Sequence, residues 1–118
     1  MKRLSLIGAS LIFSAAFAAG AARADEKTVT GQLRDSFCYM RVGAHGPSHH
    51  KCAMGCVKAG IPAALEEDGT GKIYVLLPPK DKQGTPAGVI ERMEQPVTIS
   101  GHEYSKGGVT YLTVESVK

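Results

Sequence analysis

The sequence predicts a mainly β fold for the chain after residue 24, and three features lead to that prediction. Short runs rich in β-branched residues alternate with turn residues, as in small antiparallel proteins. Two alternating segments, 96–104 and 109–117, are joined by Lys106-Gly107-Gly108, which is typical of a tight hairpin turn. One stretch, 36–60, breaks the alternation and carries all three cysteines. Together they predict a small five-stranded, OB-like antiparallel barrel with one short helix inserted after the first strand, with a β-sandwich as the alternative.

Residues 1–24 have the pattern of a secretory signal peptide. A basic start is followed by an apolar and small-residue run at 4–19, and Ala22-Arg23-Ala24 fits the small-x-small pattern of a cleavage site. An uncleaved membrane anchor is the alternative, but the run is short for a span and contains Gly and Ser. We therefore expect cleavage after Ala24, a mature domain of residues 25–118 without a membrane anchor, and a periplasmic or secreted location in a bacterium.

The charge of the mature domain argues against a nucleic-acid partner. Cleavage would remove Lys2, Arg3 and Arg23 from the 14 basic residues, which leaves 11 basic against 11 acidic residues. The formal charge of +3 therefore belongs to the precursor. A neutral domain without a basic patch is not expected to bind nucleic acid or an anionic membrane surface.

The expected elements of the mature domain follow its alternating patterns and its turn residues. Residues 25–27 are expected to be a frayed polar lead-in, and Gly31 to bend the first strand. Asp68-Gly69 is expected to turn the hairpin between the second and third strands. Strands are expected at 28–35, 61–65, 72–77, 96–104 and 109–117, with a short helix within 89–94.

The insertion at 36–60 is expected to hold a loop followed by one helix. Glycine and proline between 42 and 48 favour a loop. Ser48 is a good N-cap residue, and Gly60 suits the position just after a helix over 48–59.

On that helix, His49, Cys52 and Cys56 share one stripe, because positions i, i+3 and i+7 lie on the same face. Cys38 is expected to reach the stripe from a loop after the first strand. These four residues make a Cys₃His set of the kind that holds zinc, and thiolates also suit Cu(I) or an iron–sulfur cluster. Two nearby methionines favour copper slightly in an exported protein.

A disulfide is the alternative to a metal at these cysteines. Cys52 and Cys56, four apart in a helix, match disulfide geometry poorly, so Cys38 with either of them is the better pair. The remaining thiol would then be free, or would pair with a partner protein or a second copy of the chain. A thiol redox site ranks third, because the sequence has no Cys-x-x-Cys.

The other histidines and one aspartate are secondary candidates. His45 lies in the glycine-rich loop and can replace His49 as a ligand. Asp35 can orient a histidine ligand as a hydrogen-bond acceptor, although an aspartate at a strand end more often forms a turn. His50 is expected to be a solvated surface residue, and His102 an ordinary strand residue.

The same motif carries a resemblance to a known family. The likeness covers most of residues 28–117, and its Cys/His part is the specific portion. The chain resembles a family of small exported bacterial proteins with an OB-like barrel and no assigned reaction, which implies the barrel fold and joint action of the four Cys/His residues. The matching series is Asp35-x-x-Cys38-Tyr39, Gly43, Gly46, His49-x-x-Cys52-Ala53-x-x-Cys56, Gly60-Ile61-Pro62, Asp68-Gly69, Tyr74, Leu76 and Leu77.

No catalytic constellation is visible, so the sequence does not predict an enzyme. Neither Ser100 nor Ser116 has a visible histidine–carboxylate pairing, and Gly69-Thr70-Gly71 lacks the pattern of a phosphate-binding loop. The first hypothesis is an exported copper- or zinc-binding protein for metal buffering, delivery or electron transfer. The alternative is a disulfide-stabilised barrel that binds a small ligand or a protein partner without metal.

Overall fold

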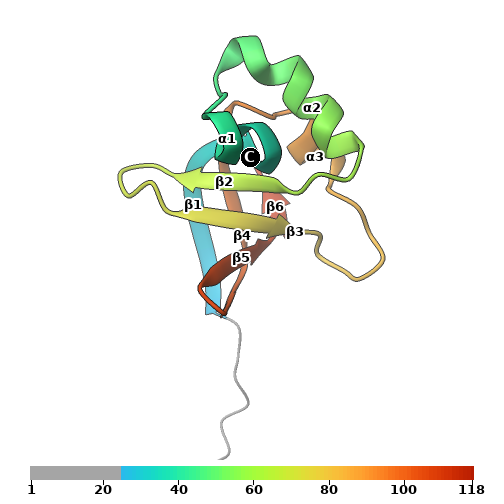
Figure 1. Ribbon diagram of the computed structural model, residues 1–118. Helices are drawn as coiled ribbons and strands as arrows, with labels where there is room; N and C mark the ends of the chain where they lie inside the picture. The colour runs from blue at the N-terminus through green and yellow to red at the C-terminus, as the bar shows by residue number, and fades with distance from the viewer. Residues whose placement is uncertain (1–24) are drawn as a thin grey trace, which may run out of the picture.

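The computed structural model describes residues 25–118, and the predicted signal peptide lies outside these described residues. Five strands close into a barrel in the order β1-β2-β3-β5-β4, with β4 pairing back onto β1 (Figure 1). The mainly β, OB-like five-stranded barrel is therefore confirmed. The strands are β1 (Asp25–Asp35), β2 (Ala63–Glu67), β3 (Ile73–Leu77), β4 (Pro96–Lys106), β5 (Val109–Thr113) and the short β6 (Ser116–Val117); the helices are α1 (Ser36–Val42), the 3₁₀ turn η1 (Pro47–His49), α2 (His50–Lys58) and α3 (Ala87–Ile90).

One strand pairing differs from the antiparallel expectation. The pairs β1–β2, β2–β3, β4–β5 and β1–β4 are antiparallel, whereas β3 and β5 run parallel. An odd number of strands cannot alternate in direction all the way around a closed ring. One parallel pair is therefore required in any closed five-stranded barrel.

Strand β1 belongs to both sides of the barrel wall. Its first part pairs with β4 and its last part with β2, and Gly31 is paired with both. A Cβ at Gly31 would lie 2.1 Å from the carbonyl oxygen of Glu66, so only glycine allows this close approach. The predicted bend at Gly31 thus falls where the strand changes partners. The prediction of a frayed lead-in is wrong, because residues 25–27 pair with 101–103 of β4.

The insertion after β1 contains two helices rather than a loop and one helix. Cys38 lies on α1, not on a loop, and α2 begins at His50 after a 3₁₀ turn, so the prediction of Ser48 as its N-cap is wrong. Gly60 does follow the helix, as predicted, with a φ of 102°. The third helix is shorter and earlier than the expected 89–94 segment. All three helices lie together at one end of the barrel (Figure 1).

The core fills the barrel and continues under the insertion. Strand residues such as Leu33, Leu65 and Tyr74 are fully buried, because alternate side chains of each strand point inward. Ala53 and Val57 of α2 belong to the same buried cluster. The helix that carries two of the cysteines is therefore held by the barrel core itself.

Candidate metal centre

Three thiols converge at the helical end of the barrel. Cys38 comes from α1, and Cys52 and Cys56 come from successive turns of α2. Their Sγ atoms all lie within 4.8 Å of one another, and none of the three is in a disulfide. Cys52 is exposed, whereas Cys38 and Cys56 are half-buried. The cluster is therefore reachable from solvent at one of its three corners.

Helix α1 is placed by its caps rather than by core packing. Asp35 is the N-cap, with an extended backbone, and its Oδ1 accepts a hydrogen bond from the Cys38 backbone N–H at 2.8 Å. Gly43 ends the helix in the left-handed region, where its N–H donates to the Tyr39 carbonyl at 2.9 Å. None of the seven residues of α1 is buried. The capping residues Asp35 and Gly43 thus determine where α1 begins and ends, and they place Cys38 in its first turn.

Helix α2 is held more firmly. Ala53 and Val57 are buried in the barrel core, which turns the flank with Cys52 and Cys56 toward α1. At its end, Gly60 donates to the Val57 carbonyl at 3.1 Å and Ile61 to the Cys56 carbonyl at 3.0 Å. These two hydrogen bonds form a Schellman motif.

The predicted ligands form two overlapping groups. His49 lies with Asp35 and Cys38, and the donor atoms of this second group are again within 4.8 Å of one another. Cys38 is shared with the three-thiol group of Cys38, Cys52 and Cys56. The structure thus brings together a thiol triad and, joined to it through Cys38, an adjoining Asp–His pair.

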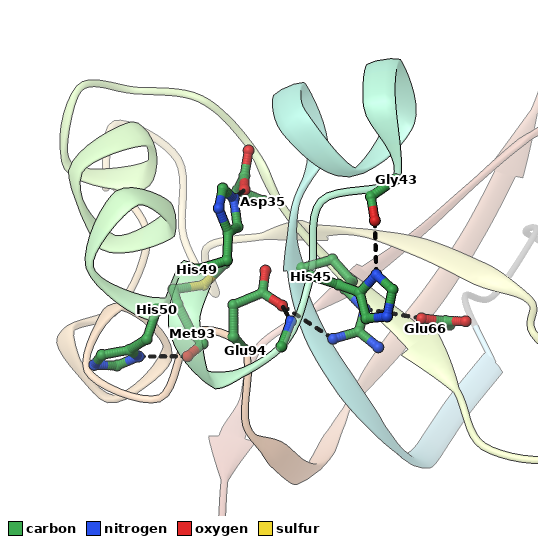
Figure 2. A network of polar contacts seen from close by, with 10 residues as sticks. Asp35, Gly43, His45, His49, His50, Glu66, Met93 and Glu94 are labelled. Atoms are coloured by element: carbon green, nitrogen blue, oxygen red, sulfur yellow. Dashed lines mark hydrogen bonds and ion pairs between the residues drawn. The ribbon is translucent and has the colours of Figure 1, made fainter.

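The Asp–His pair has the geometry expected of a histidine-orienting contact. The Nε2 of His49 lies 2.5 Å from Oδ2 of Asp35, whose side chain is fully buried (Figure 2). Asp35 therefore contacts both helices of the insertion, α1 through the Cys38 amide and the start of α2 through His49. A carboxylate in this position holds the orientation of the imidazole ring.

Burial and the nearby carboxylate favour the neutral form of two of the thiols. Burial raises the pKa of the Cys38 thiol above its ordinary value, and the charge of Asp35 raises it further. The pKa of Cys56 is raised for the same two reasons, in the same order. The raised pKa favours the protonated thiols in the metal-free protein, so binding of a metal cation would release protons.

The remaining histidines of the insertion make other contacts. His45 lies outside both groups, with its Nδ1 2.6 Å from the Gly43 carbonyl oxygen and its ring edge-on to Tyr39. His50 is half-buried and donates from Nδ1 to the Met93 carbonyl oxygen at 2.6 Å (Figure 2). The prediction that His50 is a solvated surface residue is therefore wrong. This contact holds the start of α2 against the turn between α3 and β4.

A buried ionic network also holds the insertion, and sequence reasoning did not identify it. Arg34 donates from Nε to Glu66 at 2.8 Å and from Nη1 to Glu94 at 3.0 Å. The Glu94 side chain is fully buried, and its Oε2 also accepts the Gly46 backbone N–H at 2.9 Å. Arg34 follows the inward-facing Leu33 in β1, so strand alternation predicts that its side chain points outward to solvent. In the folded protein Arg34 lies between Glu66 and Glu94, with its guanidinium carbon 5.2 Å from the ring centroid of Tyr39 in α1, and no local pattern in the sequence indicates these contacts.

No family model, no curated protein and no solved structure matches this chain. Within residues 25–118, no helix has the length and apolar character needed to cross a membrane. The functional interpretation therefore depends on the geometry of the thiol cluster and its surroundings.

Proposed function

We propose that this chain is an exported metal-binding protein that holds a copper or zinc ion with the thiolates of Cys38, Cys52 and Cys56. The observation that carries the proposal is the convergence of three unpaired thiols from two separate helices. Thiolates are the ligands that Cu(I) and zinc prefer among protein side chains. The signal-peptide pattern at residues 1–24 supports export to the periplasm.

The spacing of the sulfurs suits such an ion. Thiolates about 2.3 Å from a metal lie roughly 3.8 Å apart in a tetrahedral site and roughly 4.0 Å apart in a trigonal site. The three Sγ–Sγ distances are all at most 4.8 Å, which is compatible with both of these spacings. The donor set therefore fits a metal with only small side-chain adjustments.

The coordination number separates the two metals. Three thiolates complete a trigonal site for Cu(I), whereas zinc requires a fourth ligand. His49, beside Cys38, or a water molecule at the exposed Cys52 can supply that ligand. An iron–sulfur cluster needs four protein ligands and so depends on His49 as well. The exposure of Cys52 suits metal buffering or delivery, because a metal-binding side chain of another protein can approach the ion from that side.

Elemental analysis combined with thiol titration tests the proposal. Protein purified from the periplasm under reducing conditions is expected to carry about one equivalent of copper or zinc and, after metal removal, to titrate three thiols. Replacing any of the three cysteines by serine is expected to weaken binding by at least about tenfold, because each supplies a ligand. Lys51→Ala, an exposed change on the same helix, is the control and is expected to leave affinity unchanged. Reduced protein that takes up neither metal would overturn the proposal.

A second candidate, a ligand-binding barrel without metal, is favoured by one groove. This groove has a volume of about 480 Å³ and lies between the end of α2, strand β3 and the loop that follows β3. Val57, Leu77, Pro78 and Tyr111 give it an apolar lining. Metal-free protein with a single titratable thiol and a small apolar ligand in this groove would support the second candidate instead.

A further inference from the structure

We propose that Cys38 and Cys52 also form a reversible disulfide by exchange with a low-molecular-weight disulfide, and that this bridge releases the bound metal. The exchange depends only on the positions of the three thiols. The release of metal rests on the function proposed above.

Element geometry selects Cys38 as one member of the bridge. Cys52 and Cys56 lie four residues apart on a regular helix, where the Cβ vectors are poorly placed for a disulfide. Cys38 lies on the other helix, with its Sγ within 4.8 Å of both. A bridge to Cys38 leaves the backbone of α2 undistorted.

The two helices differ in how easily they move. The seven residues of α1 include none that is buried, and Phe37, Met40 and Val42 are exposed. In contrast, α2 is anchored by the buried Ala53 and Val57. The Sγ atoms of Cys38 and Cys52 lie at most 4.8 Å apart, and a disulfide bond is about 2 Å long. The two sulfurs must therefore approach each other by less than roughly 3 Å. Side-chain rotation and a small shift of α1 can supply that displacement without opening the core.

Exposure selects Cys52 as the thiol that meets the external disulfide. It is the exposed member of the triad, whereas Cys38 and Cys56 are half-buried. In the first step, the Cys52 thiolate attacks one sulfur of the external disulfide, whose S–S bond breaks and releases one thiolate. In the second step, the Cys38 thiolate attacks Sγ of Cys52, and the second external thiolate leaves.

The exchange is balanced in electrons and protons. Two cysteine thiols of this chain lose two electrons and two protons and become one disulfide. The external disulfide gains both and becomes two thiols. Only Cys56 then remains as a thiolate ligand, so the three-thiolate donor set no longer exists and the ion is expected to leave.

The test uses metal-free, reduced protein with oxidised glutathione as the probe, under exclusion of oxygen and metal. Trypsin places Cys38 in peptide 35–41 and both other cysteines in peptide 52–58. A disulfide cross-link between these two peptides is expected in the wild type. The Cys56→Ser variant is expected to form the same cross-link at a rate within about twofold of the wild-type rate. Fragmentation of the linked peptides then identifies Cys52 as the second member of the bridge.

The other two variants separate the steps. Cys38→Ser is expected to stop at the mixed disulfide of Cys52 with glutathione, because the resolving thiol is absent. Cys52→Ser is expected to slow the reaction at least about tenfold, because the remaining thiols are half-buried. Since α1 has no buried residue, Cys38→Ser is expected to fold, which circular dichroism checks. A cross-link within 52–58, or full closure in Cys38→Ser, would overturn the inference.

Metal measurements on the same samples distinguish the two proposals. The expected result is that loaded protein loses its ion in step with formation of the bridge. Cys56→Ser is expected to form the bridge although it binds metal at least about tenfold more weakly than the wild type. Protein that binds no metal but closes the bridge contradicts the metal function and leaves the exchange standing. A different outcome contradicts the exchange alone. In that outcome the protein binds metal, but its metal-free form stays fully reduced after treatment with oxidised glutathione.

Discussion

At the scale of single residues, Asp35 connects the fold to the thiol cluster. Its Oδ1 caps α1 through the Cys38 amide, and its Oδ2 contacts His49. After burial, its charge is the next cause of the raised pKa of both Cys38 and Cys56. One buried carboxylate therefore caps the helix that carries Cys38 and also adds to the raised pKa of the two half-buried thiols.

Asp35→Asn is expected to lower the pKa of the Cys38 and Cys56 thiols, since the negative charge that opposes their ionisation is removed. At a fixed pH near neutrality, both should react faster with iodoacetamide because more thiolate is present. Peptide mapping of alkylation against pH measures this shift. Equal alkylation profiles for the variant and the wild type would contradict the role assigned to the Asp35 charge.

The matched control for this change is Asp35→Ala. Asparagine caps a helix about as well as aspartate, whereas alanine does not, so only the alanine variant is expected to lose about 1 kcal/mol of capping free energy. Denaturant unfolding of both variants separates the capping role from the electrostatic one.

At the scale of elements, a strand glycine and a helix glycine have opposite effects on stability. Gly31 of β1 lies against the β2 backbone, where a Cβ would be 2.1 Å from the Glu66 carbonyl oxygen. At Gly55, between the two cysteines of α2, an added Cβ would meet no other element of the described chain within 4 Å. Glycine is therefore required at the first position, where backbones meet, and costs stability at the second.

Gly31→Ala is expected to destabilise the barrel by about 1–3 kcal/mol or more, because the strands must separate to admit the methyl group. Gly55→Ala, the matched control, is expected to stabilise the protein by about 0.5–1 kcal/mol through its higher helix propensity. Equilibrium unfolding in urea measures both changes. A neutral Gly31→Ala would contradict the close approach of β1 and β2.

At the scale of the whole molecule, the Arg34 network joins the barrel to the insertion. Arg34 of β1 binds Glu66 of β2 and Glu94 beyond α3, and Glu94 in turn binds the Gly46 amide of the insertion. Burial acts to raise the pKa of Glu66, but hydrogen bonds from Arg34 and Tyr39 lower it below 4.5. The Glu66 carboxylate is therefore stabilised in the folded protein.

A lowered pKa in the folded state predicts a pH-dependent contribution to stability. The contribution of Glu66 is complete above the pKa of the unfolded chain and is lost as the pH falls through the lower pKa of the folded state. Glu66→Gln is thus expected to be less stable than the wild type by about 1–3 kcal/mol at pH 7, with the difference shrinking below pH 4.5. Urea unfolding across this range measures the difference. A difference that grows toward low pH would contradict the assignment.

Much of the fold was predictable because its signals are short-range. Alternation indicated the barrel strands, the Lys106-Gly107-Gly108 turn indicated the last hairpin, and Gly60 indicated the end of the cysteine-bearing helix. Helix α1 was missed, because its N-cap Asp35 was interpreted as a strand-end turn former. The grouping of Cys38 with Cys52 and Cys56 was predicted from ligand type and spacing, and the three thiols do lie together.

The sequence by itself therefore determined the barrel class and the placement of Cys52 and Cys56 on one helix that ends at Gly60. These features depend on periodicity, caps and turn residues, each of which acts within a few positions of the chain. Only the tertiary structure decided that β3 and β5 run parallel. It also decided that Asp35 contacts His49 beside the thiol triad, and that Arg34 is buried against Glu94. These contacts join residues far apart in the sequence, and they exist because ring closure and the docking of the insertion bring them together.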